Sequence, residues 1–209
     1  MLTINYMTNA LLTSSDSIPE SQLLAAETLN AEIDLSTDPL VVQMKNTDRL
    51  ERIRTSMLAR ADLIFQTSPV SRVMRRDWNI VSAKLFLNSL DPKIRQRISE
   101  DLVELVWQST DLLDSLQTLR KPDDENLWMR PRKLQLQVIH PLAAQWLRCM
   151  RNIDSCYLIM INAEKSGVIT RKHRWAMLGP TQMAYMGFKA SAMNLPLRAA
   201  KDLLEEIGL

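Results

Sequence analysis

The segment from Lys133 to Ile139 alternates polar and apolar residues, and this pattern predicts a β-strand with one buried face. The apolar face would hold Leu134, Leu136 and Val138, and the polar face Lys133, Gln135 and Gln137. Glutamine typically bonds adenine and lysine bonds guanine when a two-stranded ribbon enters the major groove of DNA. The segment therefore predicts either a DNA-contacting strand or a short sheet edge with a solvated polar face.

A second segment of the same kind runs from Leu40 to Lys45. Its inward residues would be Val42 and Met44, and its outward residues Val41, Gln43 and Lys45. Together the two segments predict a small two-stranded antiparallel β-ribbon with one polar face.

The rest of the chain favours helices, because Met, Leu and Ala are plentiful and only 4 of the 209 residues are glycine. Apolar spacing predicts helices at 18–34, 50–64, 69–90, 92–120, 141–165, 171–178, 181–193 and 196–207. The break before Thr181 is expected because Gly179 and Pro180 interrupt the helical pattern. The expected fold class is mainly α with a small ribbon.

The order of these elements predicts two similar halves within one compact domain from 17 to 209. Residues 1–16 are polar and unpatterned, and we expect them to be flexible. The halves, 17–126 and 127–209, would each contain a strand followed by two helices, with further helices added in the first half. A polar linker at 121–126 would separate them.

Charge is segregated along the chain, although the formal net charge is only +2. Residues 1–40 carry six acidic and no basic residues, whereas residues 41–100 carry twelve basic and six acidic ones. Residues 101–126 carry two basic and seven acidic residues, and residues 127–209 carry twelve basic and five acidic ones. Basic regions of this kind are typical of a surface that contacts a phosphate backbone, although segregated charge also serves solubility or self-association.

These basic regions supply candidate contacts to duplex DNA. We expect the outward strand residues to contact base edges, namely Gln43, Lys45, Lys133, Gln135 and Gln137. We expect phosphate contacts from Arg130, Arg132, Arg171, Lys172 and Arg174, with Arg72, Arg75 and Arg76 behind them. Where Thr170 caps a helix, free backbone N–H groups and the helix dipole would assist Arg171 and Lys172. The alternative for each arginine is a solvated surface charge.

The sequence gives little support for an enzyme. His140 and His173 lie at helix starts, and neither has a ligand partner at metal-binding spacing. Four glycines leave no phosphate-binding loop, and no nucleophile motif is present. We therefore expect no catalytic residue, no metal and no cofactor, and we expect His140 to bond local backbone at its helix start.

Cysteine, tryptophan and hydropathy patterns favour an intracellular globular chain. Cys149 and Cys156 lie two helical turns apart, about 10 Å, which is too far for a disulfide, and are expected to be buried thiols. Trp107 and Trp146 are expected in the core. No apolar run of membrane length or signal pattern is seen, which favours the cytoplasm and no membrane partner.

Several motifs between residues 40 and 193 resemble a known family. The strand predicted at 133–139 is followed by His140-Pro141-Leu142-Ala143. Next come Asn152-Ile153-Asp154 within a long helix, and then Gly167-Val168-Ile169 and a basic helix. This order resembles the AcaB-like transcriptional regulators of conjugative plasmids and integrating conjugative elements. The resemblance implies a ribbon-helix-helix-like core with extra helices, and an activator of conjugative-transfer genes.

The expected function is sequence-specific binding of promoter DNA by the β-ribbon. Small ribbon-helix-helix proteins take one strand from each of two chains, whereas this chain has two candidate strands. The ribbon could therefore form within one chain or across a homodimer. The alternative is a helical protein-interaction component of the conjugation machinery, without sequence-specific DNA binding.

Overall fold

The computed structural model of the protein describes residues 39–53, 55, 58–119 and 130–195. All of them belong to one compact unit, residues 35–209. Several predictions fall outside the described residues: the flexible segment 1–16, the helices at 18–34 and 196–207, and the linker 121–126.

The strands form a three-stranded mixed sheet. They are β1 (Leu40–Val41), β2 (Ala59–Phe65) and β3 (Arg132–Val138), in the order β1-β3-β2. β1 is parallel to β3, and β2 is antiparallel to it. The predicted strand at 133–139 is confirmed, but the predicted two-stranded antiparallel ribbon is wrong, because a strand that was not predicted pairs with β3 along its whole length. These three strands do not form a ribbon-helix-helix core.

β2 occupies the second part of the segment 50–64, for which a helix was predicted. Among the described residues of this segment, the helical ones belong to the short helix α3 (Asp48–Glu51). The sequence fits two patterns here. Leu50, Ala61 and Ile64 fit a helical stripe, but from Ala59 to Phe65 every second residue, beginning with Ala59, points inward as in a strand. Seven residues of β2 pair with β3, and Leu63 and Phe65 become buried, so the long-range pairing overrides the local helical pattern.

The long helices follow the sequence closely. They are α4 (Ser68–Asn88), α5 (Pro92–Ser115), α6 (Pro141–Lys165) and α7 (Arg171–Ala192), with a 3₁₀ turn η1 (Gln117–Leu119) after α5. Asp91 and Thr170 accept backbone N–H bonds as N-caps of α5 and α7. His140 caps α6 through Nδ1, which accepts from the Leu142 N–H at 3.2 Å, as predicted.

α7 continues through Gly179 and Pro180, so the predicted interruption is wrong. Pro180 lies inside the helix and removes one backbone donor. Leu178 and Thr181, on either side of it, are both buried. Packing of these flanking residues holds the helix together across the proline.

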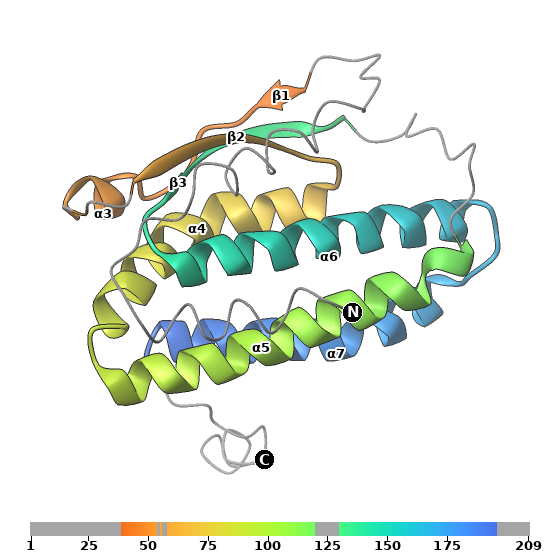
Figure 1. Ribbon diagram of the computed structural model, residues 1–209. Helices are drawn as coiled ribbons and strands as arrows, with labels where there is room; N and C mark the ends of the chain where they lie inside the picture. Colours follow the sequence, from red (N-terminus) through yellow and green to blue (C-terminus); the bar gives the residue numbers. More distant parts are fainter. Residues whose placement is uncertain (1–38, 54, 56–57, 120–129, 196–209) are drawn as a thin grey trace, which may run out of the picture. The chain divides into compact units, whose positions relative to one another are not determined.

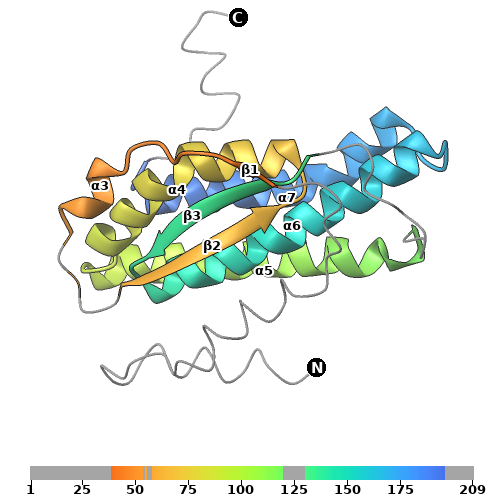
Figure 2. The ribbon, with the colours of Figure 1, turned by 90° about the horizontal axis from the view of Figure 1, so that it is seen from above.

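The elements form layers (Figures 1 and 2). The inner face of the sheet packs on α4 and α6, and α5 and α7 pack on the other side of those helices. Trp78 of α4 stacks on Trp146 of α6 with ring centroids 4.9 Å apart, and Phe188 of α7 lies 5.6 Å from Trp146. Trp146 is in the core as predicted, whereas the prediction for Trp107 is wrong, because its side chain is 58% exposed.

Two buried carboxylates join elements that are distant in sequence. Asp154 of α6 accepts the backbone N–H groups of Gln66 and Thr67, at 2.7 and 2.9 Å, and so fixes the turn between β2 and α4. Asp77 of α4 accepts from Tyr185 and Lys189 of α7, at 2.9 and 2.8 Å. These bonds fix the sheet-to-helix turn and the position of α7 against α4.

Both cysteines are buried and free, as predicted. Burial raises the pKa of Cys149 and of Cys156 to about 12, so both stay protonated thiols. In the described part of the chain, no helix combines the length and the hydrophobicity that crossing a bilayer requires.

Candidate nucleic-acid interface

The outer face of β2 and β3 carries three cross-strand pairs of side chains. Gln137 pairs with Arg60, Gln135 with Asp62, and Lys133 with Ile64. These residues alternate with the buried residues of the two strands, so the same pattern that builds the core builds the polar face. Sequence reasoning placed the β3 residues here but missed Arg60 and Asp62. The period-2 alternation at 59–65 was the signal that could have revealed them.

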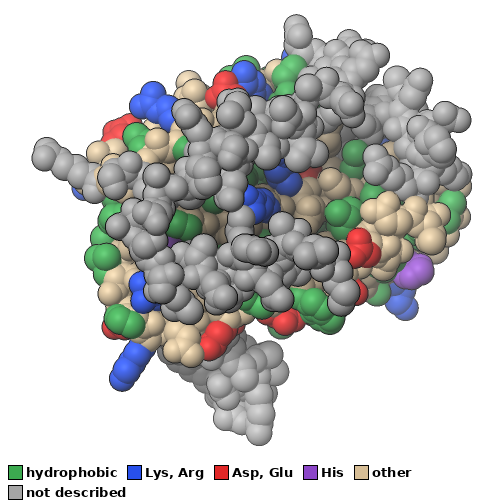
Figure 3. All heavy atoms as spheres, in the orientation of Figure 1, with side chains coloured by type: hydrophobic (Ala, Val, Ile, Leu, Met, Phe, Trp, Pro, Cys, Tyr) green, Lys and Arg blue, Asp and Glu red, His purple; other side chains and the backbone are tan. Residues whose placement is uncertain are grey.

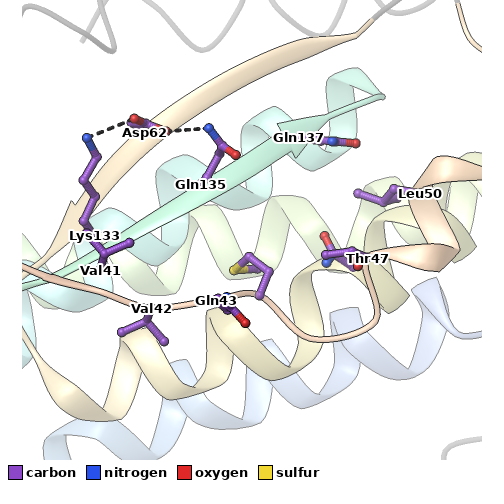
Figure 4. A pocket seen from close by; sticks show the side chains of 11 residues that line it. Val41, Val42, Gln43, Thr47, Leu50, Asp62, Lys133, Gln135 and Gln137 are labelled. Atoms are coloured by element: carbon purple, nitrogen blue, oxygen red, sulfur yellow. Dashed lines mark hydrogen bonds and ion pairs between the residues drawn. The ribbon is translucent and has the colours of Figure 1, made fainter.

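Asp62 lies at the centre of this face (Figure 4). Its carboxylate forms an ion pair with Lys133, with Nζ and Oδ2 3.0 Å apart, and accepts a hydrogen bond from the Gln135 side-chain amide at 3.2 Å. The bond from Lys133, helped by that from Gln135, holds the pKa of Asp62 below its usual value. Two of the predicted base-contacting side chains therefore already share one acidic partner.

Arg60 and Gln137 form the end of the face that Asp62 does not occupy. Neither side chain has a hydrogen-bond or ion-pair partner among the residues that the structure describes. Arg60 is exposed, and Gln137 is partly exposed. The backbone beneath them is fixed, because the Trp78 indole N–H donates to the Gln137 carbonyl at 3.1 Å. An arginine and a glutamine thus stand side by side on a rigid support.

The segment after β1 is tied to α4 by its backbone. The Arg75 guanidinium donates to the Gln43 carbonyl at 2.9 Å, and the Asn79 amide donates to the Lys45 carbonyl at 2.6 Å. The Lys45 N–H in turn donates to the Arg75 carbonyl at 3.2 Å. The predicted alternation is confirmed, since Val42 and Met44 are partly buried while Gln43 and Lys45 are exposed.

A hollow of about 520 Å³ lies where this segment diverges from β3 (Figure 4). Its polar lining comes from Gln43, Thr47, Asp62, Asn79, Lys133, Gln135 and Gln137. Its apolar lining comes from Val41, Val42, Met44 and Leu50. Four of the five strand residues predicted for base contacts, Gln43, Lys133, Gln135 and Gln137, thus line one concavity, and Lys45 does not. Within the segment that follows Pro39, only Leu40 and Val41 pair as a strand.

The arginines near the sheet differ in what they contact. Arg72 is exposed on the first turns of α4, and Arg130 is exposed just before β3. Arg76 pairs with Asp77, with Nε and Oδ1 2.7 Å apart. Arg132 lies two residues before Leu134, so it is on the core-facing side of β3. Its guanidinium donates a long hydrogen bond to the Ser71 hydroxyl, at 3.5 Å. Arg75, Arg76 and Arg132 therefore have structural partners, whereas Arg72 extends into solvent.

Burial raises the pKa of the Asp77 carboxyl, but hydrogen bonds from Arg76, Lys189 and Tyr185 outweigh that effect, and the pKa lies below its usual value. Asp77 is therefore ionised at neutral pH and needs its cations. Arg76 is one of them, so part of its charge serves the junction between α4 and α7. This partnership weakens the prediction of a phosphate contact for Arg76.

The basic start of α7 lies away from the sheet. Arg171 and Lys172 are exposed, and Thr170 caps the helix by accepting the His173 N–H at 3.1 Å, as predicted. β3 leads into the start of α6, whereas α7 begins after the end of α6 (Figure 1). Since α6 has 25 residues, its two ends are about 37 Å apart. The predicted strand and helix-start contacts are therefore not brought together in one site.

Arg174 has an additional structural role. Its Nε lies 2.5 Å from the Glu164 carboxylate, and its guanidinium carbon lies 5.4 Å from the Trp175 ring centre. These contacts tie the first turn of α7 to the end of α6. The prediction of a phosphate contact is therefore weaker for Arg174 than for its exposed neighbours.

Charge on the visible described surface is mixed. In Figure 3, Lys and Arg side chains lie among Asp, Glu and hydrophobic side chains rather than in one continuous basic area. Within the described ranges, no three His, Cys, Asp or Glu side chains gather in a geometry that could hold a metal ion. The polar face of β2 and β3 carries Arg60, Lys133 and Asp62, a balance of one positive charge, so its hydrogen-bonding groups distinguish it more than its net charge does.

Comparisons with known proteins give one likeness at the level of structure. No protein-family model and no curated protein sequence matches the chain. Among solved structures, the crystal structure of selenomethionine-containing AcaB from uropathogenic E. coli matches with a TM-score of 0.48 and 19% sequence identity. The match covers 65% of this chain and 76% of that chain.

Proposed function

We propose that the protein is a sequence-specific regulator that binds double-stranded DNA and presents the outer face of β2 and β3 to the major groove. The observation that supports this most directly is the cross-strand pair of Arg60 and Gln137, which is unpartnered among the described residues and rigidly supported. Arginine bonds guanine and glutamine bonds adenine through two hydrogen bonds each. Both groups project from neighbouring strands of one face.

The dimensions of this part of the sheet suit a groove. β1 pairs only with the first two residues of β3, so beside Gln135 and Gln137 the paired sheet is two strands wide. Neighbouring strands are about 4.8 Å apart, and the major groove is about 12 Å wide. Lys45 and Arg72, both exposed, would contact the phosphates that flank the groove.

Asp62 would limit binding to the wrong sequence. Its carboxylate repels phosphates, and its bonds to Lys133 and Gln135 must be exchanged for contacts with DNA. A carboxylate can accept from the cytosine amino group, which would return part of that cost at a matching base pair. We infer that this exchange is favourable on a matching sequence and unfavourable elsewhere.

The target genes follow from the resemblance of the motifs between residues 40 and 193 to AcaB-like regulators. We propose that the bound sites lie in promoters of conjugative-transfer genes and that binding activates them. Competition binding with fluorescent duplexes from these promoters, in wild type and in an Arg60→Ala Gln137→Ala variant, tests the assignment. Loss of discrimination in the variant, with folding unchanged, is the expected result, and unchanged discrimination would exclude this face.

A second candidate function is a protein-interaction component of the conjugation machinery. The observation that favours it is the exposure of large apolar residues on α5 and α7, including Trp107 and Met183, at 58% and 70%. Binding through these apolar residues does not require a charged partner. Only the first function predicts that one duplex sequence is preferred over another.

A further inference from the structure

The outward face of α7 carries a long uncharged surface. From Trp175 to Phe188 the chain has 14 residues without a single Lys, Arg, Asp or Glu. Trp175, Met183 and Met186 of this stretch are 47%, 70% and 61% exposed. Aromatic residues and methionine are enriched where proteins bind each other, and charged residues are depleted there. This surface is therefore unlike the solvated face of an ordinary amphipathic helix.

Two glycines lie within the same stretch, and contacts among the residues that the structure describes do not explain them. A Cβ atom placed on Gly179 or on Gly187 would meet nothing within 4 Å. Both residues are helical, and glycine destabilises a helix interior relative to alanine. Glycine is useful on a helix surface where another helix approaches closely. The two positions therefore leave space on the surface of α7 that no described residue fills.

The spacing of large and small residues is symmetric about one point of α7. Trp175 and Gly187, Ala176 and Met186, and Gly179 and Met183 each lie at equal distances from Thr181 along the helix. If a second copy of α7 lay antiparallel across the first, with the two-fold axis level with Thr181, each large apolar residue would face a small one. This is the self-complementarity that a two-fold interface requires.

We propose that this face of α7 binds a second copy of the same chain in a two-fold symmetric dimer. Met183 packs into the space above the partner's Gly179, and Trp175 packs above the partner's Gly187. Each contact occurs twice. The missing side chains at the glycines allow the two helices to approach, and the apolar groups around them are removed from water.

Charge is complementary in the same arrangement. Lys172 of one copy lies level with Ala190 of the other, one residue from Ser191, whose hydroxyl donates to Asp101 of α5. Glu100 and Glu104 are exposed on this part of α5. α7 carries four basic residues and no acidic one, whereas residues 100–115 of α5 carry five acidic residues and no basic one. The basic start of each α7 thus meets the acidic part of the partner's α5.

α5 extends the apolar surface next to α7. The Thr181 hydroxyl donates to the Gln108 carbonyl at 3.3 Å, which places Trp107 at the level of the symmetry axis. The sheet lies on the other side of α4 and α6 (Figure 1). A dimer formed here therefore leaves the polar face of the sheet uncovered, and it does not depend on the proposed DNA binding.

Sedimentation equilibrium of the full chain tests the proposal, with Gly179→Gln Gly187→Gln as the disrupting variant and Lys45→Gln, an exposed residue on the sheet side of the molecule, as the control. The wild type and the control are expected to be dimers, and the glycine variant a monomer. Its melting temperature in the monomeric state should not fall below that of monomeric wild type, because glutamine favours a helix more than glycine does. A monomeric wild type at all concentrations, or a glycine variant that dimerises as well as wild type, overturns the proposal.

Charge reversal tests the antiparallel arrangement without changing the glycines. Arg171→Glu Lys172→Glu should weaken dimerisation at least tenfold, and so should Glu100→Lys Glu104→Lys. The four changes together should restore dimerisation to within about threefold of wild type, because each reversed pair is again of opposite sign. If the combined variant is weaker than either pair alone, the antiparallel arrangement is wrong.

Discussion

Asp62 and Gln135 lie directly opposite each other in the antiparallel pair of β2 and β3, and the Gln135 amide donates to the Asp62 carboxylate at 3.2 Å. The same carboxylate pairs with Lys133 at 3.0 Å. A single acidic residue thus occupies two donors of the face that we propose for DNA. Replacing Asp62 therefore has two effects on DNA binding, because it removes a negative charge and also releases Lys133 and Gln135.

Asp62→Asn is expected to strengthen binding to unrelated DNA and to weaken discrimination. The change removes a charge that repels phosphates and releases Lys133 to contact one of them. The slope of log affinity against log salt concentration should then become steeper by about one. Affinity for matching and scrambled duplexes, measured at several salt concentrations, checks this. An unchanged slope and an unchanged ratio of affinities would show that Asp62 lies outside the contact surface.

Arg60→Ala and Gln137→Ala, made singly, should each reduce the preference for the matching duplex. Each change removes side-chain hydrogen bonds to one base, which are worth about 1–3 kcal/mol of discrimination. Arg95→Ala is the matched control, since Arg95 is an exposed arginine of α5, on another layer of the fold. If Arg95→Ala lowers the preference as much as Arg60→Ala does, the effect is one of general charge and not of base recognition.

Asp154 should make the free energy of unfolding fall between about pH 4 and pH 6. Burial raises the pKa of this carboxyl to about 6 in spite of the bonds from Gln66 and Thr67. Because this pKa is above that of the unfolded chain, the stabilisation is complete below about pH 4 and is lost as the pH rises through 6. Two pKa units correspond to about 3 kcal/mol.

Asp154→Asn is expected to remove that pH dependence. It should also destabilise the protein by about 1–3 kcal/mol, because one amide oxygen replaces two carboxylate oxygens that accept from three donors, the Gln66 and Thr67 N–H groups and the Thr67 hydroxyl. Urea unfolding of both proteins from pH 4 to pH 7 provides the comparison. Parallel stability curves for the two proteins would mean that Asp154 does not titrate in this range.

His140 should contribute a pH dependence of the opposite sign. Burial, together with the positive charge of Arg95, lowers the pKa of His140 to about 4. The unfolded chain binds this proton at higher pH, so the stabilisation is present above about pH 6.5 and is lost as the pH falls through 4. His140→Asn replaces the capping Nδ1 with an amide oxygen that can accept the same N–H, and it should flatten this dependence because asparagine does not titrate. The same slope in both proteins between pH 6.5 and pH 4 would rule His140 out as its source.

The helices and β3 could be predicted from sequence because their signals are local. α4, α5 and α6 begin next to proline and polar caps, and β3 has an unbroken alternation. β2 could not be distinguished, since Ala61 and Ile64 fit a helical stripe as well as a strand, and only pairing with β3 decides between the two. Pro180 was given too much weight for a similar reason, because packing on both sides keeps α7 continuous.

The candidate site was predicted in part. Gln135 and Gln137 were placed on the polar face correctly because parity alone determines the face of a strand residue. Their partners Arg60 and Asp62 were missed together with β2. Arg132 was assigned to phosphates by its charge, although its parity puts it with Leu134 and Leu136 on the core-facing side. Contacts between distant segments determine which arginines and lysines already have partners. A single sequence does not show these contacts.

The proposed function is tested most directly by competition binding of the full chain to duplexes from transfer-gene promoters, against scrambled duplexes of the same composition, at near-physiological salt. We predict tight binding to at least one promoter duplex, with an affinity at least a thousandfold above that for its scrambled form. Equal binding to every duplex, or no binding at all, would contradict a sequence-specific regulator.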